Sequence, residues 1–207
     1  MGTEKLNPFM DMLNTMIHFV MLNVIFLLTC LPVFTTGAAL ASLYYVLIKE
    51  VKGEYGYVTR TYLKELKRNF KTGTAAFFIL FLTGALLLFN LLFWPAQGNG
   101  FSYAVTGLLA ALTVIWLTIS HYTYPLIGRF VNTPVQSIKN AWGLAIRNLK
   151  TTGLLLAMDA CIVCFLLFSP MKLLLLALPL CGVVLPAYLR AKILAGVFAP
   201  YENYRED

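Results

Sequence analysis

Long apolar runs constrain this chain more than any other feature of its sequence. Six of them cover residues 13–31, 37–48, 74–94, 103–128, 152–168 and 173–195. Most approach the roughly 20 residues that an α-helix needs to cross the hydrocarbon core of a bilayer. Only 12% of the 207 residues are charged, about half the share of a soluble domain, so the chain cannot cover a water-facing surface. The sequence therefore predicts an all-α, multi-pass membrane bundle that forms one domain over residues 1–207.

The number of spans depends on the second run, 37–48, which is short for a crossing. If it is a span, the chain forms three helical hairpins whose outer turns contain Pro32, Pro95 and Pro170. All of the 16 basic residues except Lys172 then lie on the same side as both termini. Because Lys and Arg are retained in the cytoplasm, this pattern favours six spans with cytoplasmic N- and C-termini. Five spans is the alternative.

Two nearly identical phrases, RNFKTG (68–73) and RNLKTTG (147–153), each end a basic segment and precede an apolar run. Apolar residues recur at helical spacing in segments 56–71 and 134–150, which predicts two cytoplasmic amphipathic helices. Such helices lie in the headgroup layer or dock a partner protein. The interface candidates are Arg60, Lys64, Lys67, Arg68 and Lys71 in the first segment, and Arg129, Asn132, Lys139, Asn140, Trp142, Arg147, Asn148 and Lys150 in or beside the second.

The spacing also predicts which face of each helix is apolar. The first face consists of Tyr55, Val58, Tyr62, Leu66 and Phe70, and the second of Ile138, Ala141, Trp142, Ala145 and Leu149. The stretch Thr133–Pro134–Val135–Gln136 is typical of a capping box with proline at the first helical position.

Polar residues inside the apolar runs are the candidates for an intramembrane site. Asp159 is the only acid in a run, and His121 is expected at a similar depth, so the two side chains are expected to pair. The pair is interpreted either as an interhelical hydrogen-bond clamp or as part of a proton or solute path. His18, with Asn14 and Asn23, forms a polar stripe on the first run, and Asn90 lies on the third.

Motifs for soluble chemistry are missing. The sequence contains no GxxxxGK[ST] phosphate loop, no HExxH and no GxSxG. Cys161 and Cys164 have CxxC spacing, but two further ligands for zinc are not apparent. We therefore expect no enzyme activity, no cofactor, no metal and no nucleic-acid partner.

Three stretches carry a resemblance to a known family. They read CLPVFTTGAALASLYYVLIKEVKGE (30–54), FKTG (70–73) and YPLIGRFVNTPVQSIKNAWGLAIRNLKTT (124–152). Together they resemble the YesL family of bacterial integral membrane proteins, and the resemblance covers nearly the whole chain. The first stretch carries a turn motif at Pro32, Thr35 and Gly37.

The resemblance implies a location in the bacterial plasma membrane and an accessory role in carbohydrate uptake. Genes of that family commonly lie beside those of sugar-binding proteins and permeases of ABC importers, and no catalytic residues are established for it. We therefore expect an accessory protein that binds the permease or ATPase subunits of an oligosaccharide importer. The alternatives are a small secondary carrier with a path at His121 and Asp159, and a lipid-binding scaffold. Membrane lipids and a second copy of the chain are further expected partners.

Overall fold

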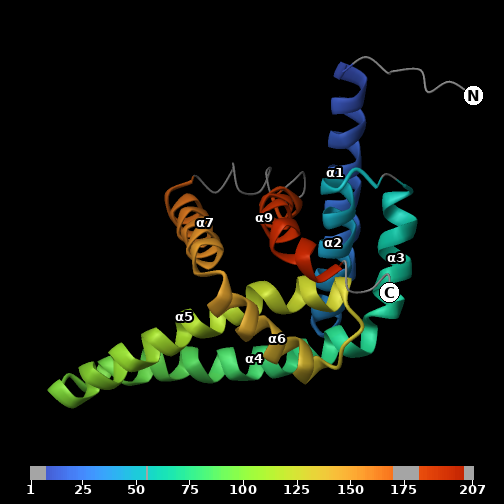
Figure 1. Cartoon of the computed structure of the whole chain (residues 1–207). Coiled ribbons are helices and arrows are strands. Elements are labelled where there is room, and N and C mark those ends of the chain that lie inside the picture. Colours follow the sequence, from blue (N-terminus) through green and yellow to red (C-terminus); the bar gives the residue numbers. More distant parts are fainter. Residues whose placement is uncertain (1–7, 55, 170–181, 203–207) are drawn as a thin grey trace, which may run out of the picture.

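The structure is a computed structural model that describes residues 8–54, 56–169 and 182–202. Every regular element in these residues is a helix, which confirms the all-α prediction (Figure 1). The α-helices are α1 (Pro8–Cys30), α2 (Thr36–Val51), α3 (Val58–Arg68), α4 (Phe70–Phe93), α5 (Gly100–Arg129), α6 (Pro134–Arg147), α7 (Leu149–Phe168) and α9 (Val184–Glu202). Short 3₁₀ turns, η1 (Val33–Thr35) and η2 (Pro95–Gln97), lie in two of the connections.

Three of these helical stretches are long and apolar enough to cross a membrane by length and composition. They are Phe70–Gln97, Gly100–Arg129 and Leu149–Phe168. The described apolar part of the first run, Met16–Cys30, is shorter. The predicted run 173–195 lies partly outside the described residues, and its described part belongs to the beginning of α9. The helices support a membrane protein, while the count of six spans stays a prediction.

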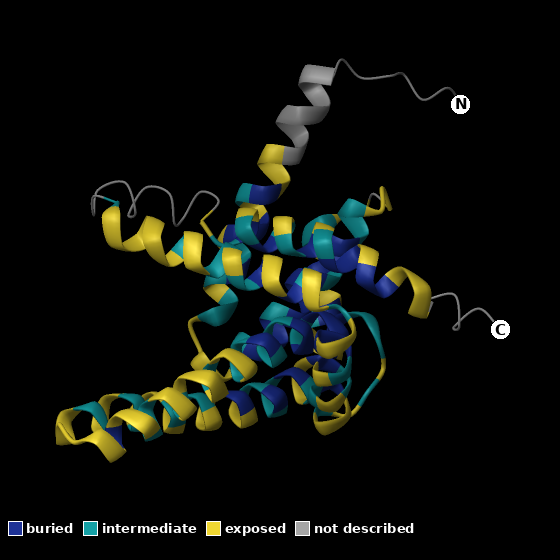
Figure 2. Cartoon of the chain, turned by 60° about the vertical axis from the view of Figure 1, so that its left-hand side comes forward, coloured by how far each residue is buried: buried dark blue, intermediate teal, exposed yellow. Residues whose placement is uncertain are grey.

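Helices α4 and α5 form a long hairpin that extends away from the other helices (Figure 1). No Asp, Glu, Lys or Arg occurs between Lys71 and Arg129, and most of the hairpin surface is exposed (Figure 2). An apolar surface of this extent is stable only against lipid or another apolar surface. We call the end of the hairpin that carries Lys71 and Arg129 the basic end of the molecule.

Local contacts explain how the hairpin is closed. At its tip, the Asn99 side chain accepts from the Ser102 N–H at 2.8 Å, and the Ser102 hydroxyl forms the reciprocal bond, which makes a capping box at the start of α5. Along its length, Trp116 Nε1 donates to the Leu80 carbonyl at 3.0 Å. Gly84 makes room for this indole, because a Cβ at that position would lie 2.5 Å from the ring.

Helix α2 is the centre of the fold. It packs against α1, α3, α4, α5 and α9, and its small residues allow two helices to approach very closely. A Cβ on Gly73 of α4 would lie 2.6 Å from Cα of Ala38, and a Cβ on Gly128 of α5 would overlap the carbonyl of Ala41. With 16 residues, α2 is only about 24 Å long. The shortest apolar run is therefore apolar because protein surrounds it.

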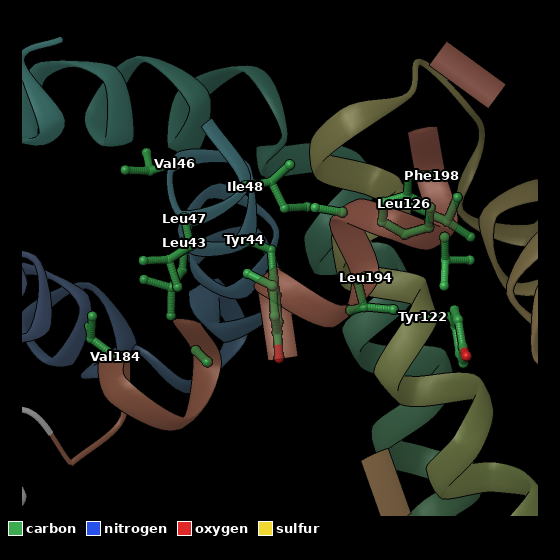
Figure 3. Packing of buried hydrophobic residues seen from close by; sticks show 14 of the residues in the cluster. Leu43, Tyr44, Val46, Leu47, Ile48, Tyr122, Leu126, Val184, Leu194 and Phe198 are labelled. Atoms are coloured by element: carbon green, nitrogen blue, oxygen red, sulfur yellow. The ribbon is translucent and has the colours of Figure 1, made fainter. Parts of the chain in front are cut away.

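The main hydrophobic core lies where α2 meets α5 and α9. Leu43 and Leu47 of α2 are fully buried, as are Tyr122 of α5 and Leu194 and Phe198 of α9 (Figure 3). α1 contributes more than apolar contacts. The side-chain oxygen of its buried Asn23 accepts from the backbone N–H groups of Val183 and Val184 at 3.2 Å each, so α1 caps the start of α9.

The repeated phrases mark two helix junctions. Asn69 lies between α3 and α4, and Asn148 lies between α6 and α7, and each ends one helix and begins the next. The Asn148 side chain donates to the Leu144 carbonyl at 3.0 Å, which satisfies an acceptor at the end of α6. The structure thus ends the two amphipathic helices at Arg68 and Arg147, a few residues before the predicted ends at 71 and 150.

The buried face of α3 largely agrees with the prediction, because Val58 and Leu66 pack against the main core on either side of Tyr62. The buried face of α6 differs from the predicted one. In α3, Tyr62 is fully buried and its hydroxyl bonds the Thr29 hydroxyl at 2.6 Å, while Phe70 is exposed. Tyr55 lies outside the described residues. In α6, the predicted members Trp142 and Leu149 are exposed. The buried positions are Ser137, Ala141, Leu144 and Ala145. α6 packs closely on α5, and a close helix contact prefers small side chains to an indole.

The start of α6 also differs in detail. The Thr133 hydroxyl accepts from the Gln136 N–H at 3.3 Å, with Pro134 at the first helical position. This is one of the two bonds of the predicted capping box. The helix therefore begins where the sequence predicts, with the predicted side-chain cap and proline at its start.

Candidate functional site

An ion cluster joins three helices inside the bundle. One carboxylate oxygen of Asp159, on α7, bonds His121 Nε2 of α5. The other accepts from Arg190 Nη2 of α9 at 2.5 Å. The side chains of His121, Asp159 and Arg190 are 13%, 22% and 20% exposed. The expected pairing of His121 with Asp159 is present, and a third charged residue completes it.

Arg190 is not among the intramembrane polar residues predicted from the sequence. Its guanidinium also lies near the hydroxyl of Tyr44 on α2. Arginine stays charged at any ordinary pH, so it supplies the counter-ion that a carboxylate in low dielectric requires. The lone acid of the apolar runs was the signal that such a cation had to exist.

The cluster is important for α7 because this helix has few other attachments. Thr152 and Leu155 are its buried residues. The Thr152 hydroxyl contacts the Tyr122 hydroxyl at 3.1 Å and donates to the Ala145 carbonyl at 3.0 Å. The remaining surface of α7 is largely exposed. The polar contacts of Thr152 and Asp159 therefore set how α7 sits against α5, α6 and α9.

The other intramembrane candidates lie apart from this cluster. His18 on α1 is exposed. Asn90 on α4 donates to the Leu86 carbonyl at 2.8 Å and accepts from Trp94 Nε1 at 3.2 Å, so its amide is satisfied near the tip of the hairpin. None of the hydrogen bonds of the Asp159 cluster reaches either residue.

A second charged group surrounds the Tyr45 ring at the basic end. Lys49, Arg68 and Arg129 lie 5.9, 5.7 and 5.9 Å from the ring centroid. Arg68 also pairs with the buried carboxylate of Glu65 at 3.1 Å. Partial burial and the positive charge of Arg129 lower the pKa of nearby Lys52. Arg68 and Arg129 are thus part of the packing at this end as well as of its positive surface.

The remaining cations of α3, together with Lys71 in the first turn of α4, form an open basic face. The exposed residues are Arg60, Lys64, Lys67 and Lys71. The structure shows no ion pair from them to a carboxylate of the described residues. This is the surface that the sequence predicts.

Helix α6 has three faces instead of two. One is buried, as described above. A second is apolar but exposed, and contains Val135, Trp142 and Ile146, followed by Leu149 beyond the helix end. The third is polar and contains Lys139, Asn140 and Arg147. An exposed apolar face beside a basic one is typical of a helix at a membrane surface or in a protein interface. Lys150, in the first turn of α7, is exposed.

A pocket of about 590 Å³ opens between α5, α6 and α9. Its polar lining is formed by Asn132, Lys139, Asn140 and Arg147. Leu126, Phe130 and Phe198 form an apolar wall, and Gly143 lies between the two cations on α6. Four of the sequence-predicted interface residues thus meet in one cavity, which the sequence could not show because the wall comes from α5 and α9.

The turn motif has a structural role. The Thr35 hydroxyl bonds the carbonyl of Thr29 and donates to the carbonyl of Pro32 at 2.6 Å, which closes the turn between α1 and α2. Gly37 then lies against Gly73 of α4. Among the described residues, no group of three or more His, Cys, Asp or Glu side chains is arranged to hold a metal ion.

Comparison with known proteins gives one match. The model of the family described as "Protein of unknown function, DUF624" matches residues 19–91, which contain most of α1, all of α2 and α3, and most of α4. No curated protein and no solved structure matches the chain. Over residues 19–91 the chain is thus similar to a family without an assigned activity.

Proposed function

We propose that the chain is an accessory integral membrane protein of a bacterial carbohydrate importer, which binds the permease or ATPase subunits through α3 and α6. The resemblance to the YesL family supports this class of system and a location in the plasma membrane. The positive-inside pattern supports an orientation with α3, α6 and both termini in the cytoplasm.

The observation that carries the docking proposal is the exposed apolar face of α6. Trp142 is 41% exposed and Ile146 is 49% exposed, and both lie beside exposed cations. Tryptophan and arginine are enriched at the energetic centres of protein interfaces. A partner with an apolar groove and an acidic rim would complement this surface.

The test is affinity purification of the full chain in mild detergent from its native host. We expect importer permease or ATPase subunits to co-purify, and Trp142→Ala with Ile146→Ala to reduce their recovery about tenfold or more. The control is Leu82→Ala with Phe89→Ala, which removes two large apolar side chains from the hairpin that are more exposed than Trp142 and Ile146. A lone protein in the eluate, together with unchanged growth on oligosaccharides after gene deletion, would favour the scaffold alternative.

A small secondary carrier is the second candidate, and one observation favours it. Nε of Arg190 is buried and has no hydrogen-bond partner among the described residues, so a donor is available beside the Asp159 pair. Charged residues at membrane depth are typical of transport paths. Solute uptake by reconstituted vesicles should then be lost in the Asp159→Asn, His121→Ala double variant. Uptake that survives both changes would exclude a path through this cluster.

A further inference from the structure

The pocket between α5, α6 and α9 combines two chemistries. Lys139 and Arg147 extend from one face of α6, separated by Gly143 and accompanied by the amides of Asn132 and Asn140. The opposite side is apolar. Its accessible part is Phe130 and Val131, and behind them the buried Leu126 and Phe198 lie together at the edge of the core (Figure 3). A ligand that satisfies both sides carries negative charge at one end and hydrocarbon at the other.

The cations of the pocket are available to a ligand. The structure shows no ion pair between either Lys139 or Arg147 and a carboxylate of the described residues. Guanidinium and ammonium groups are the usual partners of phosphate oxygens in proteins. Two of them at one cavity, with amide donors beside them, favour a phosphate over a neutral headgroup.

The place of the pocket in the fold favours a lipid over a soluble phosphate ester. It opens at the basic end, where the apolar hairpin ends at Arg129 and the amphipathic helix α6 begins. A soluble phosphate would leave the accessible apolar lining, half-buried Phe130 and exposed Val131, against water, whereas an acyl chain would cover it. Burial of apolar area contributes about 25 cal/mol per Å².

We propose that this pocket binds an anionic phospholipid, with its phosphate against Lys139 and Arg147 and the first part of an acyl chain against Phe130 and Val131. This inference goes beyond the importer proposal and does not depend on it. The site lies on the polar face of α6, whereas the proposed docking surface lies on its exposed apolar face.

The test is native mass spectrometry of the delipidated, purified full chain after addition of phosphatidylglycerol or phosphatidylcholine. We expect one tightly bound phosphatidylglycerol, with phosphatidylcholine binding much more weakly. The double variant Lys139→Gln, Arg147→Gln should lower phosphatidylglycerol affinity about 30-fold, because each cation near an anionic lipid contributes about fivefold. The control Lys64→Gln, Lys67→Gln removes the same charge from the open face of α3 and should change affinity less than threefold.

A second pair of variants tests the cavity itself. A Cβ on Gly143 or on Gly153 meets no atom within 4 Å, so Gly143→Phe and Gly153→Phe should both fold. Gly143→Phe fills the pocket and should abolish tight binding, whereas Gly153→Phe should not. The proposal would be overturned if the α3 control variant lost as much phosphatidylglycerol affinity as the Lys139→Gln, Arg147→Gln variant, or if Gly143→Phe still bound the lipid tightly. Either result would show only a general attraction of the lipid to basic helices.

A competition arm distinguishes the source of the phosphate. Glycerol 3-phosphate carries the charge without the acyl chains. We expect a hundredfold excess over the lipid to leave phosphatidylglycerol bound. Displacement at that excess would make the site one for soluble phosphate esters and would overturn the lipid assignment.

Discussion

The α4–α5 hairpin and helix α2 have similar hydropathy but opposite surroundings. In the hairpin, large side chains such as Leu82 and Phe89 are exposed, at 72% and 63%. In α2, Leu43 and Leu47 are fully buried. The hairpin is apolar because its solvent is lipid, and α2 is apolar because protein packs on it from several sides. Hydropathy alone therefore identifies helices that avoid water, but it does not show whether lipid or protein surrounds them.

The largest expected effect tests whether polar contacts hold α7 against α5 and α9. Asp159→Ala leaves Arg190 without its counter-ion, and removal of one partner from a buried ion pair costs about 3–5 kcal/mol. We expect a matching loss in the free energy of unfolding in detergent, measured by circular dichroism with a denaturant. A variant as stable as the parent would mean that α7 is held by other contacts.

The same substitution in both regions gives the sharpest comparison. Leu43→Ala creates a cavity beneath α2 and should lower the free energy of unfolding by about 3 kcal/mol. Leu82→Ala removes an equal side chain from the exposed hairpin and should change it by less than about 0.5 kcal/mol. Equal effects in the same unfolding assay would show that the hairpin surface is covered by protein, as in an oligomer.

The close approach of the α4 backbone to α2 leads to a smaller expected loss of stability. Gly73→Ala places a methyl group 2.6 Å from Cα of Ala38, and the overpacking should cost about 2 kcal/mol. The control is Gly107→Ala on α5, where the new Cβ meets nothing within 4 Å. Since alanine favours a helix over glycine, the control should raise stability by up to about 1 kcal/mol. Thermal unfolding of both variants would measure the difference in sign.

The smallest expected effect lies in the hairpin. Trp116→Phe removes the indole donor to the Leu80 carbonyl and the Thr83 hydroxyl but keeps an aromatic ring beside Gly84. A hydrogen bond of this kind contributes about 1 kcal/mol. The loss should appear in denaturant unfolding of the full chain. A loss as large as that of Asp159→Ala would contradict the view that packing holds the hairpin and polar contacts hold α7.

Several parts of this arrangement were predictable from local patterns. The helical class, the long hairpin, the junctions at Asn69 and Asn148 and the start of α6 at Pro134 all follow from residues close in sequence. The pairing of His121 with Asp159 also followed, because two polar groups at similar depth in low dielectric satisfy each other. Arg190 was missed because a cation near a helix end has two low-energy positions, one at the membrane surface and one beside an acid.

The sequence by itself determined that this chain avoids water and approximately where its described helices lie, because hydrocarbon run length, capping groups and charge placement act over short distances. Only the tertiary structure decided that α2 is covered by protein, that Trp142 faces outward, and that Lys139 and Arg147 share a cavity with Phe198. Those outcomes depend on which faces of α5, α6 and α9 meet. Which faces pack together depends on the shapes of side chains that are far apart in the sequence, and hydropathy does not describe shape.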